Sequence, residues 1–208
     1  TWDGEGGGVL LNQCPHQLDL LQWICGLPKT VQAFCQIGKW HNIEVEDDVT
    51  AYLQFENGAT GVFVTTTGDA PGTNRFEVTG TLGKLVCEND ELTFWKLSED
   101  EREFCRTAKE GFAKPPCEKI TVETDGENLQ HVGVLNAFAG KILRGEPLVA
   151  EGCEGINGLT LSNAMHLSSW LGHPVEIPFD EELFLSELNK RRATSQKKES
   201  KEITFSTE

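Results

Sequence analysis

The chain has 208 residues, of which 38% are hydrophobic and 25% are charged, a composition typical of a globular protein with a sizeable core. It contains 18 Lys and Arg residues against 33 Asp and Glu residues, so the formal net charge is −15. Because an acidic surface repels phosphate groups, nucleic acids and anionic membranes are not expected partners. No apolar run approaches the ~18–20 residues that a membrane span needs, and no signal peptide is recognisable.

The sequence contains a single methionine, Met165, and starts with Thr-Trp-Asp-Gly, so we expect it to be part of a longer polypeptide. Its seven cysteines include no Cys-x-x-Cys pair, which favours free thiols in a reducing cytoplasm. Cys25 and Cys35 lie in apolar runs and are predicted to be small buried hydrophobes. Cys14 and His16 are the nearest candidates for zinc ligands, but no second cluster accompanies them, so no metal site is expected.

The chain is predicted to open with a loop and a helix. Residues 3–8 are too rich in glycine for regular structure. Apolar residues then recur at helical spacing over residues 9–25, and the Gly-Leu-Pro sequence that follows is typical of a helix end. Because proline is tolerated only in the first turn of a helix, Pro15 places the expected start near Leu11 or Asn12.

The middle of the chain is rich in strand signals. Its apolar and β-branched residues predict strands at residues 30–39, 49–55, 60–67, 75–79, 85–87, 92–97 and 120–123. The Asn57-Gly58 pair between two of these runs is the strongest short signal for a hairpin. Residues 98–116 are charged and irregular, and we expect a loop there.

The last part of the chain is again helical. Apolar spacing predicts helices at residues 131–143, 156–171 and 180–192, and a short strand at residues 175–178. Asp180 is the expected N-cap of the last helix. Consecutive strands with short turns argue against parallel βαβ units. We therefore predict an α+β fold, a largely antiparallel open sheet with helices packed on one face, formed by residues 1–192 and followed by a polar tail at residues 193–208, in which residues 203–205 are a further candidate strand.

The glycine-rich segment at residues 4–8 invites comparison with a phosphate-binding loop. A dinucleotide fingerprint, Gly-x-Gly-x-x-Gly, directly follows a strand. Here no strand precedes the glycines, and Val9 stands where the third glycine is needed. Nucleotide binding by this loop alone is therefore not predicted.

Three polar residues are the main candidates for a site. Asn12, His16 and Asp19 are spaced i, i+4 and i+7, so they share one stripe of the predicted helix. Such a stripe ordinarily faces solvent, but histidine is also the side chain best suited to proton transfer near neutral pH. In that interpretation Asn12 binds a ligand hydroxyl or caps the helix, and Asp19 orients the ring. Trp2 is a candidate for stacking on a sugar ring, although local packing is its more ordinary role.

Residues 6–28, in which a Gly-Gly-Gly-Val run leads into the His16 helix and ends in Gly-Leu-Pro, resemble the glucose–fructose oxidoreductase/inositol dehydrogenase (Gfo/Idh/MocA) family. The resemblance continues through residues 78–85, 145–149, 154–159, 164–168 and 175–178. It implies a two-domain enzyme of which this chain is the substrate-binding and oligomerisation domain. The N-terminal dinucleotide-binding domain, with its NAD or NADP site, is not in this sequence.

The resemblance further implies hydride transfer to or from a sugar, polyol or cyclitol, with His16 as the catalytic acid–base group and with Asn12, Asp19 and Trp2 as substrate contacts. Many relatives have an acidic residue in place of Asn12, so a substrate contact is expected there rather than a proton relay. No cofactor-binding residue is assigned in this chain, which alone is expected to be inactive. A homodimer or homotetramer through the open sheet face is also implied. The alternative is a non-catalytic relative that senses sugar and cofactor.

Overall fold

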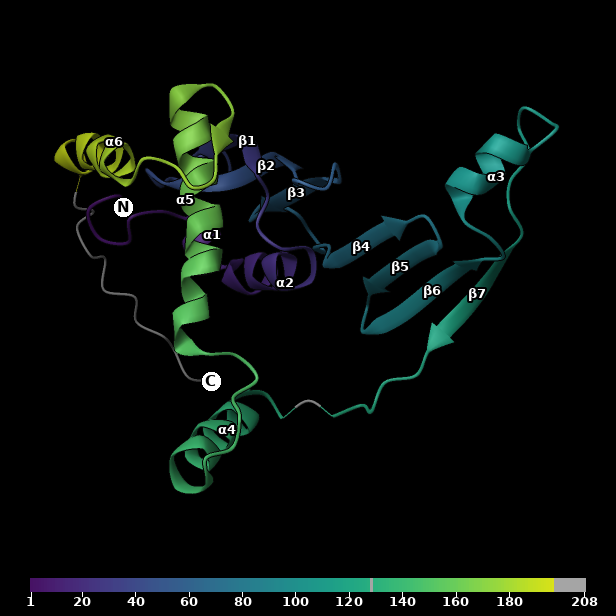
Figure 1. Cartoon of the computed structure of the whole chain (residues 1–208). Helices are drawn as coiled ribbons and strands as arrows, with labels where there is room; N and C mark the ends of the chain where they lie inside the picture. Colours follow the sequence, from purple (N-terminus) through teal and green to yellow (C-terminus); the bar gives the residue numbers. More distant parts are fainter. Residues whose placement is uncertain (128, 197–208) are drawn as a thin grey trace. The chain divides into compact units, whose positions relative to one another are not determined.

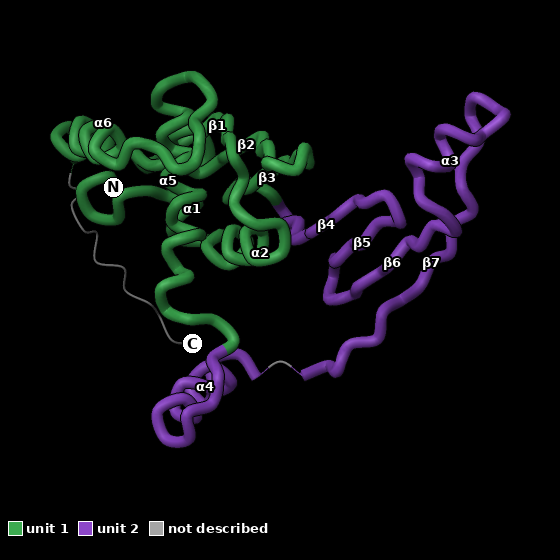
Figure 2. The backbone as a smooth tube through the Cα atoms, viewed as in Figure 1, with its two compact units in different colours: residues 1–69, 149–208 green, residues 70–148 purple. Residues whose placement is uncertain are grey.

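A computed structural model describes residues 1–127 and 129–196 of the chain (Figure 1). These residues divide into two compact units: unit 1 comprises residues 1–69 and the chain from residue 149 onward, and unit 2 comprises residues 70–148 (Figure 2). Every strand pair among the described residues is antiparallel, which confirms the predicted α+β class. The strands form two four-stranded sheets rather than the single open sheet that was expected.

Unit 1 combines one sheet with helices, and its strands follow the order β3-β2-β1-β8. Its elements are α1 (Val9–Asn12), α2 (Pro15–Cys25), β1 (Thr30–Ile37), β2 (Glu46–Gln54), β3 (Thr60–Thr66), η1 (Gly152–Glu154), α5 (Gly155–Leu171), β8 (Val175–Glu176) and α6 (Glu181–Ala193). The predicted hairpin is confirmed between β2 and β3, where Gly58 adopts a φ of +85°. Asp180 caps α6 as predicted, because its carboxylate accepts the N–H groups of Glu182 and Leu183 at 3.0 Å each.

The helix predicted at residues 9–25 is divided in two. Pro15 is the first residue of α2, where its missing N–H leaves no hydrogen bond unmade. The Cys14 thiol, at the N-cap position of α2, donates to the carbonyl of Val9 at 3.1 Å and closes the junction with α1. The prediction placed the start at Leu11 or Asn12, and it missed the short helix α1 that precedes the break.

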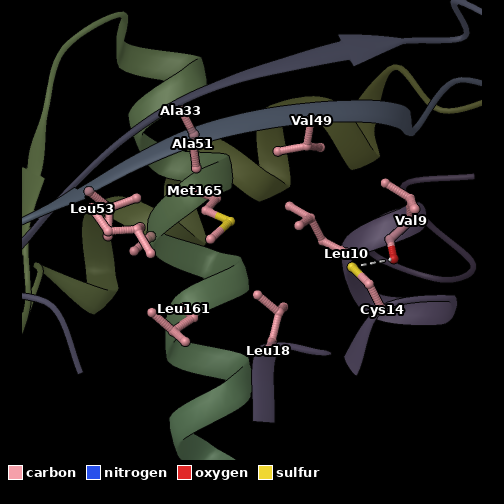
Figure 3. Close-up of a cluster of buried hydrophobic side chains, with 12 residues drawn as sticks. Val9, Leu10, Cys14, Leu18, Ala33, Val49, Ala51, Leu53, Leu161 and Met165 are labelled. Carbon is pink, nitrogen blue, oxygen red and sulfur yellow. Dashed lines mark hydrogen bonds between the residues drawn. The ribbon is translucent and has the colours of Figure 1, made fainter. Parts of the chain in front are cut away.

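The core of unit 1 lies between its sheet and α5. Val31, Val49 and Leu53 are completely buried on one face of the sheet. Leu161 and Met165 of α5 pack against that face, and Leu10 and Leu18 of the first two helices join the same cluster (Figure 3). The opposite face of this sheet carries exposed apolar side chains in cross-strand register, namely Phe34, Tyr52, Val62 and Val64.

Side chains of α5 complete the hydrogen bonding of one edge of β1. Strand β8 pairs only with Thr30 and Val31, so the later N–H groups of β1 lack a strand partner on that side. The hydroxyl of Ser168 accepts the N–H of Ala33 at 3.0 Å, and the hydroxyl of Ser169 accepts the N–H of Cys35 at 3.0 Å. These bonds fix α5 against the sheet as well as satisfying buried backbone donors.

Unit 2 contains the second sheet, in the order β4-β5-β6-β7. Its elements are β4 (Arg75–Gly80), β5 (Gly83–Glu88), β6 (Glu91–Leu97), α3 (Glu101–Thr107), β7 (Cys117–Val122) and α4 (Gln130–Arg144). Helix α3 corrects the loop expected at residues 98–116. The carboxylate of Asp100 caps it by accepting the N–H groups of Arg102 and Glu103 at 2.9 and 3.2 Å, a signal that the sequence did contain.

The seven cysteines are all free thiols. Cys14 is buried and Cys35 is half-buried, and burial raises the pKa of these thiols to about 11 and about 12. Cys25 is exposed, so the prediction that it is buried is wrong: its apolar neighbours lie on an uncovered side of α2. None of the helices among the described residues has the length and apolar character of a membrane-spanning segment. The suggested tail strand at residues 203–205 lies outside the described residues.

Candidate functional site

The predicted site residues lie around the α1–α2 junction. Asn12 is the last residue of α1, whereas His16 and Asp19 belong to the first turns of α2, and all three are exposed. The break at the junction means that they do not share one continuous helical stripe, although His16 and Asp19 remain on the same side of α2. Cys14 rather than Asn12 occupies the N-cap of α2, which leaves the carboxamide of Asn12 available to a ligand.

The His16 ring has no hydrogen bond or ion pair within the part of the chain that the structure describes. Asp19 does not orient this ring, because its carboxylate accepts the side-chain N–H of Gln22 at 2.9 Å. Leu20 and Trp23, one and two turns beyond His16, remain 46% and 66% exposed. The imidazole therefore stands at one end of an uncovered apolar surface of α2.

The glycine-rich segment does not fit a pyrophosphate. The N–H groups of Gly8 and Leu10 donate to Oε1 of Glu46 at 2.8 and 3.1 Å, so these amides already have an anionic partner. A Cβ on Gly8 would lie 2.0 Å from the carbonyl oxygen of Glu46. Only glycine therefore lets the backbone at residue 8 approach the backbone of Glu46 this closely. The segment serves internal packing, as its mismatch with the dinucleotide fingerprint suggested.

Glu46 forms a buried pair with His166 of α5. Oε2 of Glu46 lies 3.0 Å from Nε2 of His166, and both side chains are 0% exposed. Burial alone would raise the pKa of the Glu46 carboxyl, but His166 and the Leu10 amide hold it below its usual range. This pair was not predicted from the sequence, because strand alternation with Val49 places Glu46 on the opposite face of the sheet. A register shift at Gln36/Ile37 turns Glu46 into the core.

Aromatic rings enclose the buried histidine. The ring of His166 stacks on Trp170, with centroids 5.3 Å apart and planes inclined by 13°. Trp2 meets both rings edge-on at 5.7 Å and is only 6% exposed. This position supports local packing, rather than stacking on a sugar ring, as the role of Trp2.

A second buried carboxylate organises the loop between β1 and β2. Asp47, 1% exposed, accepts the backbone N–H groups of Lys39, Trp40 and His41 at 2.9, 2.8 and 2.9 Å. Burial alone would raise its pKa, but these three donors hold the pKa of the Asp47 carboxyl below its usual range. The neighbouring Asp48 accepts the indole N–H of Trp40 at 3.1 Å. The loop is thus fixed from within the fold.

A shallow pocket of about 250 Å³ lies beside the β2–β3 hairpin, and no residue of the α1–α2 junction lines it. Its lining residues are Lys29, Thr30, Gln54, Phe55, Glu56, Gly58, Ala59 and Thr60. An exposed ion pair of Lys29 and Glu56, at 3.1 Å, crosses the same region. None of the predicted site residues lines this pocket, and we assign it no role.

Residues 1–86 match the family profile of the GFO/IDH/MocA C-terminal domain, which confirms the resemblance found in the sequence. Comparison with curated protein sequences finds no match. Among solved structures, the WlbA dehydrogenase from Chromobacterium violaceum, in complex with NADH and UDP-GlcNAcA, is 29% identical with a TM-score of 0.61. That match covers 84% of this chain and 47% of the dehydrogenase.

Two further structures share the fold at lower identity. A levoglucosan dehydrogenase in complex with NADH and levoglucosan is 18% identical, with a TM-score of 0.65 and coverage of 86% of this chain and 54% of the enzyme. The aldose-aldose oxidoreductase from Caulobacter crescentus, complexed with glycerol, is 19% identical, with a TM-score of 0.63 and coverage of 83% and 48%. The chain thus spans about half the length of the structures that it resembles.

Proposed function

We propose that this chain, whose first 86 residues match the GFO/IDH/MocA C-terminal domain, is the substrate-binding and oligomerisation part of an NAD- or NADP-dependent oxidoreductase acting on a sugar, polyol or cyclitol. The observation that carries the proposal is the position of His16 within the matched segment: its ring is exposed at the start of α2, beside the exposed Asn12. The NADH and sugar ligands of the similar dehydrogenases support the substrate class and the cofactor class.

In this proposal the residues of the chain bind the substrate and handle its proton. The nicotinamide, held by the rest of the protein, supplies or accepts the hydride. When a carbinol carbon is oxidised, its hydroxyl proton must leave, and the imidazole of His16 accepts it within hydrogen-bond reach. The carboxamide of Asn12 cannot relay a proton, but it can donate to and accept from a substrate hydroxyl. Asp19, tied to Gln22, borders the same end of α2.

Two uncovered apolar surfaces support the remaining parts of the proposal. Leu20 and Trp23 extend from His16 along α2, as expected where another domain completes a substrate cleft. On the unit 1 sheet, Phe34, Val62 and Val64 are 62%, 69% and 63% exposed on the face opposite α5. A two-fold axis brings the same apolar face of two copies together, so a homodimer, or a homotetramer built from it, is the proposed assembly.

Replacing His16 in the full-length protein tests the catalytic role. His16→Gln keeps hydrogen bonding but removes the titrating ring, so we expect kcat to fall about 10²–10⁴-fold with substrate binding retained. His131→Gln is the matched control, because His131 is an exposed histidine in unit 2. NAD(P)H absorbance measures turnover, and tryptophan fluorescence measures binding. Unchanged turnover in His16→Gln rejects the assignment of His16.

A sensor that binds sugar and cofactor without turnover is the second candidate. The observation in its favour is the side-chain amide of Asn12, which cannot relay a proton to or from His16. The two candidates differ in the wild-type protein: a sensor binds NAD(P)H and a sugar but shows no substrate-dependent change in NAD(P)H absorbance. Asn12→Asp leaves a sensor inactive, whereas in an enzyme it changes KM or kcat.

A further inference from the structure

The buried Glu46–His166 pair connects three segments that are distant in sequence. Glu46 begins β2, His166 lies in the middle of α5, and the amides of Gly8 and Leu10 belong to the segment that enters α1. Oε2 of Glu46 and Nε2 of His166 are 3.0 Å apart, and the contact does not meet the geometry of a regular hydrogen bond. No other partner of these two atoms, or of Nδ1 of His166, is found in the described part of the chain. The pair thus acts as an electrostatic contact at the centre of unit 1.

One end of this carboxylate fixes the backbone just before the candidate site. Oε1 of Glu46 receives the two amides at the start of α1, at 2.8 and 3.1 Å. From Leu10 the chain runs through one short helix and a closed junction, where Cys14 donates to the Val9 carbonyl at 3.1 Å, before it reaches His16. Because α1 is a single turn, a shift at its first residues is passed directly to Asn12 and to the start of α2.

The other end of the carboxylate is set by the histidine. With a hydrogen on Nε2, His166 places a donor toward Oε2 of Glu46 and leaves only an acceptor, Nδ1, without a partner. With the hydrogen on Nδ1 instead, a buried N–H has no acceptor and the lone pair of Nε2 points toward the Glu46 carboxylate. Both features are unfavourable. Stacking on Trp170 and the close approach of Gly7, where a Cβ would lie 2.9 Å from Cε1, keep the ring from turning.

We propose that Glu46 and His166 are positioning residues. The Nε2–H of His166 orients the buried carboxylate of Glu46, and this carboxylate holds the start of α1. Asn12 and His16 are thereby kept in a fixed geometry. This inference rests on the proposed function for its catalytic consequence, but the anchoring itself is measurable without turnover. Glu46 and His166 touch neither substrate nor cofactor in this role; they act through the backbone of residues 8–16.

Amide hydrogen exchange of the whole chain tests the anchoring directly. In Glu46→Ala the Gly8 and Leu10 amides lose their acceptor, and we expect their protection to fall by about tenfold or more. The hairpin amide of Phe55, bonded to the Ala59 carbonyl at 2.9 Å, should keep its protection and so reports that unit 1 is still folded. Glu46→Gln retains an acceptor oxygen and serves as a second variant in case Glu46→Ala does not fold. It should keep most of the protection of the Gly8 and Leu10 amides.

Glu56→Gln is the matched control, because Glu56 is a strand-flanking carboxylate with 79% of its side chain exposed. It should leave the Gly8 and Leu10 amides unchanged. Full protection of these two amides in Glu46→Ala, with the fold intact, overturns the proposal. If the wild-type protein shows no turnover, the proposed function is rejected. The protection of the Gly8 and Leu10 amides still decides whether Glu46 anchors the start of α1.

Two histidine variants separate positioning from packing in the full-length enzyme. The amide nitrogen of Gln reaches the place of Nε2, whereas that of Asn falls near Nδ1. His166→Asn should therefore lower kcat by about 10–100-fold at nearly constant cofactor KM, and His166→Gln should restore most of it. Equal losses in both variants mean that His166 acts only through ring packing, and this outcome overturns its role in orienting the Glu46 carboxylate.

Discussion

The two units of the chain differ in what their side chains bury. In unit 1 the sheet, α1, α2 and α5 enclose a dense core that includes two carboxylates, Glu46 and Asp47. In unit 2, Gly140 is the one buried residue among those described. Apolar residues of its helix α4, such as Leu135 and Phe138, remain 68% and 57% exposed. Regular secondary structure is therefore common to both units, but only unit 1 encloses polar groups that can set the geometry of a site.

The largest expected effect tests this difference in the cores. Leu161→Ala removes a completely buried side chain of α5 and should lower the free energy of unfolding of unit 1 by about 2–5 kcal/mol. Leu135→Ala, the same change at a position that is 68% exposed in unit 2, should cost less than about 1 kcal/mol. Urea denaturation followed by circular dichroism measures both. Equal losses would contradict the contrast between the units.

The buried carboxylates should make unit 1 sensitive to acid. Because the pKa of Asp47 is lower in the folded chain than its ordinary value, its stabilisation is present above pH ~4 and is lost as the pH falls through the folded pKa. Asp47→Asn should lower stability at pH 7 by roughly 2–3 kcal/mol and flatten the dependence of stability on pH below about pH 4. Thermal unfolding at several pH values measures this. Asp69 is exposed, so the control Asp69→Asn should change neither the stability at pH 7 nor its dependence on pH. If Asp47→Asn leaves the pH dependence of stability unchanged, the prediction is refuted.

The open sheet face of unit 1 should be the next most sensitive region. Val64→Lys places a charge among Phe34, Tyr52 and Val62, so the proposed dimer should weaken by about tenfold or more. Val149→Lys, at a valine that is 89% exposed outside the sheet, should leave the assembly unchanged. Light scattering after size-exclusion chromatography gives the mass. A dimer that persists in Val64→Lys places the interface elsewhere.

The smallest effect concerns the cysteines, of which the two that are not exposed, Cys14 and Cys35, both lie in unit 1. Burial protects Cys14 and Cys35 of unit 1 and raises their thiol pKa values to about 11 and about 12. Cys87 and Cys117 of unit 2 are exposed. At pH 8, iodoacetamide should modify the exposed thiols while the two buried ones stay unmodified, because the thiolate is the reactive form. Peptide mass spectrometry identifies the modified positions, and early alkylation of Cys14 would show that the unit 1 core opens readily.

Local signals were sufficient for most elements but not for the site. The hairpin at Asn57-Gly58 and the Asp180 cap were predicted correctly, since a few neighbouring residues determine each of them. Helix α3 was missed because residues 98–116 were interpreted as a loop from their charge and prolines, and the cap at Asp100 was not recognised. The placement of His16 near the start of a helix was anticipated, whereas the break between α1 and α2 was not.

The sequence by itself determined the α+β class, most of the strands and helices, the β2–β3 hairpin and the family resemblance, because periodicity, turns and caps are properties of short segments. Only the tertiary structure decided that the strands form two sheets and that the first helix is broken at its junction. It alone also decided that Glu46 faces inward to meet His166. That contact depends on a register shift between two strands and on a helix from the far end of the chain, and no local pattern encodes either.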